Sequence, residues 1–144
     1  MTEHVETPWH FWPMLFLTVL WQGCLATGYV LWRIEHPAWI GRFPPDFSGF
    51  LDELPLWAEL VWALAVWAGL LGALLMVGRV AGAALALAIG FLGLLGLMLG
   101  LFVLPPGLPA VAGRGHMALF IAAVAVSAGL WAYAREQKQA GVLD

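Results

Sequence analysis

The sequence predicts an all-α protein, an integral membrane four-helix bundle with a short interfacial helix in its first loop. Hydrophobic residues make up 62% of the 144 residues and charged residues only 10%, against about 45–50% and about 25% in soluble domains. Six basic and nine acidic side chains are too few to cover a soluble domain. Four long stretches also lack any charged residue, and each approaches or exceeds the roughly 20 residues that a helix needs to cross the hydrocarbon core.

These stretches place four helices in order along a single domain, residues 1–144. We expect transmembrane helices at about 11–32, 56–78, 80–104 and 116–134. The third stretch is the longest, but Pro105, Pro106 and Pro109 end its helix near Leu104, because proline interrupts helical hydrogen bonding. The chain before the first helix is acidic and contains no Lys or Arg, which favours a retained helix over a cleaved signal peptide.

The connections between the helices predict how they are arranged. A tight turn around Gly78 and Arg79 predicts that the second and third helices form an antiparallel pair. Four crossings place both ends of the chain on one side. The positive-inside rule does not choose that side, since three basic residues fall near the helix ends on each. The acidic first loop favours cytoplasmic termini.

The first loop has a pattern of its own. Pro44, Pro45 and Asp46 are typical of a helix start, where proline is tolerated and an acidic side chain suits the helix dipole. We therefore expect an amphipathic helix at about 45–54, lying on the membrane surface. An irregular loop anchored by its aromatic side chains is the alternative. Apolar residues at helical spacing support the helix: Phe47, Phe50, Leu51 and Leu54.

Small residues recur on the second and third helices. They are Gly69 and Ala73 on the second, and Gly93, Gly96 and Gly100 on the third. Such spacing lets helix backbones approach closely in lipid, where no hydrophobic force drives helices together. The pattern indicates a packing face, used either inside this chain or against another subunit.

Tryptophan is abundant, with nine residues. Six fall near the ends of the predicted spans, where indole rings commonly form an interfacial belt. Trp21, Trp62 and Trp67 lie deeper. They are expected to pack against neighbouring helices, and contact with a bound lipid or pigment is the alternative. No other cofactor is expected.

Polar side chains within the spans are sparse. Gln22 is the strongest hydrogen-bonding group at depth, and we expect it at a helix interface. A substrate path would need several converging polar groups, a charge or a broken helix. His10 and His116 begin helices on opposite sides of the membrane and cannot share a haem iron. The lone Cys24 excludes a thiolate zinc site, so we predict no catalytic or metal site.

Several short motifs over the first two helices, their loop and the tail occur together: Pro8-Trp9-His10, Leu20-Trp21-Gln22, Phe43-Pro44-Pro45-Asp46-Phe47, Pro55-Leu56-Trp57 and Tyr133-Ala134-Arg135. In these motifs the chain resembles a family of small four-helix membrane proteins of proteobacteria, whose function is unknown and which are sometimes automatically labelled "sugar transporter". The resemblance is weak over the third helix. It implies a multi-pass protein of the bacterial inner membrane and transfers no catalytic or binding residue.

Composition and pattern together favour one function and leave a second open. The net charge of −3, without a basic stripe, argues against nucleic acid as a partner. Membrane lipids and other membrane-protein subunits are the expected partners. We predict a non-catalytic accessory or stabilising subunit of a larger bacterial inner-membrane complex, respiratory or photosynthetic. The alternative is a small transporter or channel acting as an oligomer, which would need a polar lumen.

Overall fold

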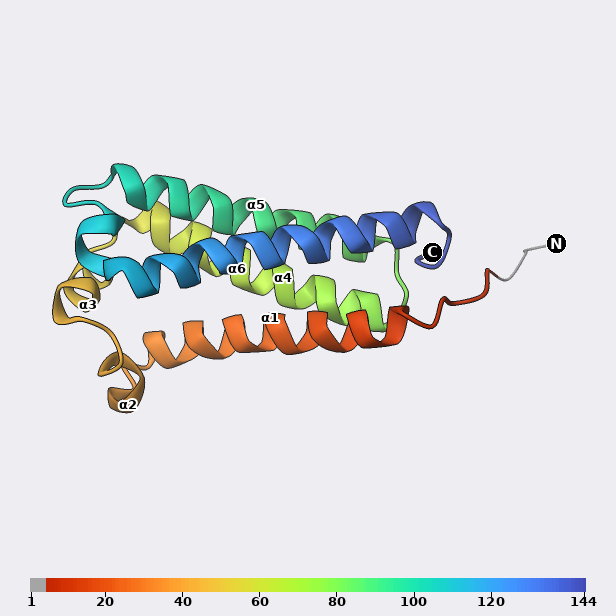
Figure 1. Cartoon of the computed structure of the whole chain (residues 1–144), viewed down its shortest axis with the longest axis horizontal. Coiled ribbons are helices and arrows are strands. Elements are labelled where there is room, and N and C mark those ends of the chain that lie inside the picture. Colours follow the sequence, from red (N-terminus) through yellow and green to blue (C-terminus); the bar gives the residue numbers. More distant parts are fainter. Residues whose placement is uncertain (1–4) are drawn as a thin grey trace.

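The computed structural model describes residues 5–144 and is all-helical there. Its helices are α1 (Phe11–Arg33), α2 (Pro37–Ile40), α3 (Pro45–Asp52), α4 (Leu56–Val77), α5 (Gly82–Val103) and α6 (Leu108–Gln139). Four of them, α1, α4, α5 and α6, are long and apolar enough to cross a membrane. They run along one common axis, with α2 and α3 at one end (Figure 1). The predicted fold class is confirmed.

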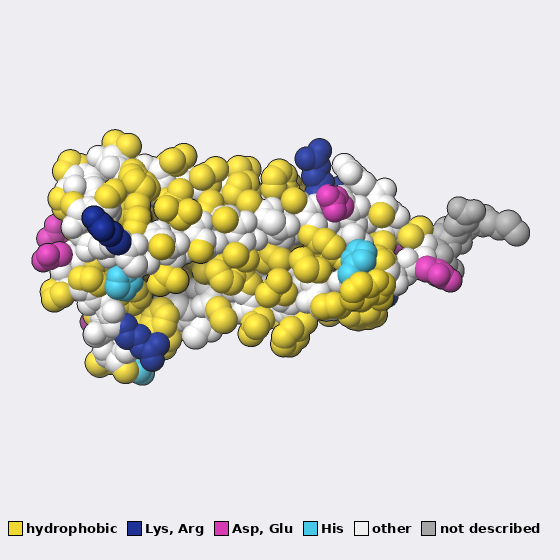
Figure 2. All heavy atoms as spheres, viewed as in Figure 1, with side chains coloured by type: hydrophobic (Ala, Val, Ile, Leu, Met, Phe, Trp, Pro, Cys, Tyr) yellow, Lys and Arg dark blue, Asp and Glu magenta, His cyan; other side chains and the backbone are white. Residues whose placement is uncertain are grey.

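The surface of the bundle has the character that a membrane requires. Figure 2 shows hydrophobic side chains along the whole visible face, with Lys, Arg, Asp and Glu gathered toward the two ends. Large apolar side chains such as Phe16, Leu64 and Leu92 are more than half exposed. Such exposure is costly in water and ordinary in lipid. The chain is therefore a multi-pass membrane protein.

A closely packed pair, α4 and α5, forms the centre of the bundle, as the turn around Gly78 predicts. Within residues 5–144, α1 packs mainly on α4 and α6 mainly on α5. Glycine makes the central contact possible. A methyl group on Gly90 would lie 2.9 Å from the Cα of Gly69, and one on Gly93 would lie 2.8 Å from the Cβ of Ala65. The two backbones are thus as near as they can be without a side chain between them.

The ends of the described chain meet at the end of the bundle opposite α3. A methyl group on Gly141 would lie 3.4 Å from Cγ2 of Val5. The backbone N–H of Asp144 donates to the carbonyl of Arg79 (2.8 Å), and the N–H of Ala81 donates to the carbonyl of Asp144 (2.7 Å). Both ends therefore lie on one side, as four crossings require. Glu3, whose side of the membrane was also predicted, lies outside the described residues.

The last helix differs most from its predicted bounds of 116–134. Helical structure begins at Leu108 and continues to Gln139, with a break at Gly113, where φ is 68° and ψ is 169°. The prediction treated the prolines after Leu104 only as a stop signal. Pro109 instead occupies the first turn of the next helix, where its missing N–H costs no hydrogen bond.

Replacing Gly113 by alanine is expected to destabilise the protein. Its φ and ψ lie in a region that is essentially restricted to glycine, and strain of this kind costs about 1–3 kcal/mol. The free energy of unfolding in detergent micelles should fall by that amount. Gly115→Ala is the matched control, since a methyl group there would meet no atom within 4 Å. Equal stability of the two variants would contradict the prediction.

Candidate functional site

The small residues predicted to form one packing face on α4 and α5 have different surroundings in the structure. Gly69, Ala73 and Gly93 lie in the seam between the two helices. Gly100 lies under the Trp57 ring of α4, and a methyl group there would be 3.0 Å from its Cζ3. Gly96 instead points outward, with no atom of the described chain within 4 Å of where a methyl group would be. Packing inside the chain accounts for four of these residues, and only Gly96 remains open to a partner.

Gln22 lies at a helix interface, as expected. It is 4% exposed, and a methyl group on Gly69 would lie 2.8 Å from its Cδ, so the absent side chain of Gly69 makes room for the amide. Nearby on α1, the hydroxyl of Thr18 donates to the carbonyl of Met14 (2.7 Å). These two polar side chains are therefore engaged in helix structure and packing.

The three deeper tryptophans have different surroundings. The Nε1–H of Trp21 donates to Oγ of Ser127 at 3.2 Å and so links α1 to α6. Trp62 lies edge-on to the Tyr29 ring, with 5.2 Å between ring centroids. Trp67 is 47% exposed on the outer face of α4. Only the first two line an internal space.

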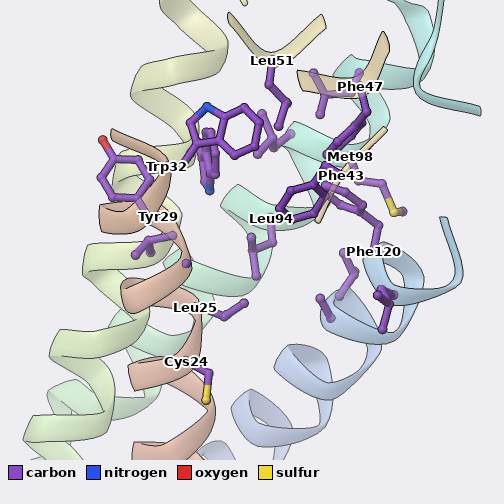
Figure 3. Close-up of a pocket in the computed structure, with 18 of the residues that line it drawn as sticks. Cys24, Leu25, Tyr29, Trp32, Phe43, Phe47, Leu51, Leu94, Met98 and Phe120 are labelled. Carbon is purple, nitrogen blue, oxygen red and sulfur yellow. The ribbon is translucent and has the colours of Figure 1, made fainter. Parts of the chain in front are cut away.

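That space is a cavity of about 310 Å³ between α1 and α6, toward the end that α2 and α3 cover. Figure 3 shows Cys24 and Leu25 of α1 on one side and Phe120 of α6 on the other. Side chains of α4 and α5 form its floor and those of the first loop form its roof. The lining includes Trp21, Trp32, Trp39, Phe43, Phe47, Leu51, Trp62, Leu94, Leu97, Met98, Ala123 and Val124.

At the other end of the bundle, hydrogen bonds join α6 directly to α1 and the residue that precedes it. There, Nδ1 of His10 and the hydroxyl oxygen of Tyr133 lie 2.8 Å apart in a hydrogen bond. The Trp21–Ser127 hydrogen bond joins the same two helices further along. Each outer helix otherwise packs mainly on its own partner in the central pair, α1 on α4 and α6 on α5. The side chains that line the space between α1 and α6 leave it open as the cavity.

The predicted interfacial helix exists as α3, but it covers the end of the bundle rather than lying only on the membrane surface. Phe47 is 1% exposed. Its ring centroid lies 6.4 Å from that of Trp32 on α1 and 6.0 Å from those of His116 and Phe120 on α6. Leu51 is buried in the same cluster. The apolar face of α3 therefore packs against protein side chains, and it bridges the two outer helices, α1 and α6.

The other two residues of the predicted helix border a second hollow, although Leu54 follows the end of α3 at Asp52 and lines the first cavity as well. Phe50 and Leu54 line a space of about 510 Å³ between α3 and the α5–α6 connection, together with Asp46 and Glu53. The mixture of acidic and apolar side chains contrasts with the cavity behind Phe47, whose lining is mainly apolar and contains no charged side chain.

Charged groups lie at the edges of these sites. Arg33 pairs with Glu59 at 3.4 Å, and both side chains are more than a third exposed, so the pair contributes at most about 1 kcal/mol. The guanidinium carbon of Arg42 lies 5.6 Å from the ring centroid of Trp39. His10, which precedes α1, contacts Tyr133 near the end of α6. His116 lies near the start of α6 and stacks on Phe47, so the two imidazoles are at opposite ends of that helix. Residues 5–144 contain no cluster of three His, Cys, Asp or Glu side chains that could hold a metal ion.

The fold and these sites define a multi-pass membrane protein with a capped, apolar cavity between its outer helices. No protein-family model, curated protein or solved structure matches the chain. The sequence analysis singled out Trp21 and Trp62 as deep tryptophans, and Phe47, Leu51 and Leu54 as residues of an interfacial helix, but it did not predict that they line a common cavity. Trp39 and Phe43 could have been predicted as lining residues, because they are aromatic and lie in a loop that was expected to contact apolar surroundings.

Proposed function

We propose that the protein is a non-catalytic accessory or stabilising subunit of a larger bacterial inner-membrane complex. One observation carries the proposal. The outward face of α6 carries a stripe of exposed small residues, which the exposed Leu119 and Ile121 flank near its start. The stripe has spacings of three and four and consists of Ala118, Ala122, Ala125, Gly129 and Ala132. Residues at this spacing lie on one face of a helix, so the stripe runs along about four turns.

The outward face of α4 provides a comparison within the same molecule. It has the same spacing but carries large exposed side chains: Leu60, Leu64, Trp67, Leu71 and Leu74. Large side chains suit contact with lipid tails, whereas small ones let another helix backbone come close. A methyl group on Gly129 would meet no atom of the described chain within 4 Å. The stripe is therefore free to receive a helix of another subunit.

The polar side chains of the spans favour this function over transport. Gln22 packs against Gly69, and the Thr18 and Ser127 hydroxyls form hydrogen bonds within the bundle. A translocation path needs polar groups that converge on a shared space, and the cavity lined by Trp21 and Trp62 is apolar. The alternative, an oligomeric transporter or channel, rests on the family resemblance and would use the same stripe between copies of this chain.

Replacing Gly129 by leucine is expected to release the protein from its partner. The added side chain keeps the helices apart, and the lost contacts have no hydrophobic compensation in lipid. A tagged chain would be purified in mild detergent from the native membrane, and co-purifying proteins would be identified by mass spectrometry. Recovery of the partner should fall by about tenfold or more, which corresponds to about 1.4 kcal/mol.

The control is Gly23→Leu on α1, where an added methyl group also meets no atom within 4 Å. This variant should recover the same complex as the unmodified chain. If the unmodified protein purifies as a uniform small oligomer without other subunits, and Gly129→Leu turns it into a monomer, the accessory function is wrong and the oligomeric alternative is supported.

A further inference from the structure

We propose that the cavity between α1 and α6 binds one acyl chain of a membrane phospholipid, with the anionic headgroup beside Arg42. This site is independent of the docking stripe on α6, because the cavity is lined by a different face of that helix, at Phe120, Ala123 and Val124. The proposal rests on the chemistry of the lining, the size of the space and the position of a basic residue at its edge.

The lining selects an apolar ligand. It contains no charged side chain, and its polar groups are the indole N–H groups of its tryptophans, the Tyr29 hydroxyl and the Cys24 thiol. The Nε1–H of Trp21 is bonded to Ser127, and Figure 3 shows the hydroxyl oxygen of Tyr29 directed away from Phe43 and Met98 on the opposite wall. A polar headgroup inside the cavity would lose its hydrogen bonds to water, which costs several kcal/mol. A hydrocarbon chain loses none.

The size of the cavity selects a narrow ligand. Its volume of about 310 Å³ is at the lower end of the range of about 300–1,000 Å³ for small-molecule pockets. One chain fits this volume better than a two-chain lipid body or a large ring system. Each methylene group that enters gains the packing contacts of aromatic side chains such as Phe47 and Phe120, which a disordered bilayer supplies less densely.

The capped end places a positive charge where a headgroup would lie. Since α1 ends at Arg33 and α2 follows it, α2 lies beyond the membrane-spanning part of the bundle. The ring of Trp39 on α2 lines the cavity, and the Arg42 guanidinium lies over the same ring at 5.6 Å from its centroid. A chain inserted below Trp39 therefore brings its phosphate to the level of Arg42.

The test is native mass spectrometry of the full chain, purified in mild detergent from membranes of known phospholipid composition. The unmodified protein should retain one phospholipid per chain. Ala123→Trp and Val124→Phe both fill the cavity and should lower the retained fraction by about tenfold or more. Leu92→Trp is the control, because Leu92 is 58% exposed on α5 outside the lining, and it should retain lipid as the unmodified chain does.

Arg42→Gln tests the headgroup separately. The preference for anionic over zwitterionic phospholipid should fall by about fivefold, the effect of one basic residue near an anionic surface, while total chain binding persists. Thermal unfolding identifies any variant that fails to fold. If one cavity-filling variant is unfolded, lipid retention by the other one tests the proposal. Equal lipid retention by Leu92→Trp and a folded cavity-filling variant would overturn the proposal. So would recovery of an isoprenoid lipid in place of the phospholipid, identified by mass and absorbance.

Discussion

Replacing Gly90 by leucine is expected to prevent α4 and α5 from packing. The first added carbon would already lie 2.9 Å from the Cα of Gly69 and 3.1 Å from the carbonyl oxygen of Ala65. These are backbone atoms, so neither can turn aside as a side chain could. Overpacking in a well-packed core commonly costs about 1–3 kcal/mol and sometimes more. We expect at least about 3 kcal/mol here, since the central pair must separate along its length.

The measurement is thermal unfolding in detergent, together with the fraction of protein that elutes as a single species. Gly96→Leu is the control on the same helix. Its side chain points away from α4, with no atom of the described chain within 4 Å of an added methyl group, so the folded bundle should tolerate it. A comparable loss of stability in both variants would show that the seam does not depend on Gly90.

Phe47→Asp is expected to have an effect at least as large, at the other end of the bundle from the chain termini. The Phe47 ring is 1% exposed among Trp32, His116 and Phe120. Loss of a buried phenylalanine side chain costs about 3–5 kcal/mol, and a carboxylate in the same place adds an unpaired buried charge. The variant should detach α3 from the bundle and open the roof of the cavity.

Solvent accessibility of introduced cysteines along α3 would report this detachment. Phe50→Asp on the same short helix is the control, because Phe50 lines the outer hollow that already contains Asp46 and Glu53. It should change accessibility much less than Phe47→Asp. If Phe50→Asp releases α3 and Phe47→Asp does not, the structural assignment of the inward face is wrong.

The overall fold was predictable because membrane spans are encoded locally. A run of uncharged residues longer than the hydrocarbon core needs no information from the rest of the chain. The short turn at Gly78 and Arg79 likewise predicted the antiparallel pair of α4 and α5. The sequence prediction missed the short helical stretch between Leu108 and the break at Gly113. A proline can stop one helix and begin another, and the sequence does not say which proline does which.

The faces of the helices were less predictable. Gly93 and Gly96 are equally small, yet a methyl group on Gly93 would lie 2.8 Å from the Cβ of Ala65, whereas one on Gly96 would meet no atom of the described chain within 4 Å. Spacing alone does not distinguish them, because a packing face looks the same whether its partner is internal or external. The small-residue stripe that includes Gly129 was missed for a related reason. Alanine occurs on every side of α6, so only the exposed fractions of its residues single out one face.

The cavity could not have been predicted from sequence patterns. Its walls come from elements far apart in the chain, and the Trp21–Ser127 hydrogen bond that marks its lower end joins residues 106 positions apart. Trp21 and Trp62 stood out as deep tryptophans. Whether they packed tightly or bordered a space depended on the separation of α1 and α6, which is a tertiary property.

The unequal attachment of the outer helices has a mechanical consequence. α4 and α5 form the rigid centre of the bundle, because their backbones are in close contact at Gly69 and Gly90. α1 and α6 are fastened to each other by hydrogen bonds at His10 and Trp21, and farther along they are coupled only through the aromatic side chains of the cap. α1 and α6 are therefore joined directly near the chain ends, whereas near α3 they are joined through the side chains of the cap. Separation of α1 from α6 near α3 would therefore disrupt the contacts of Phe47, whose ring lies against Trp32 on α1 and Phe120 on α6.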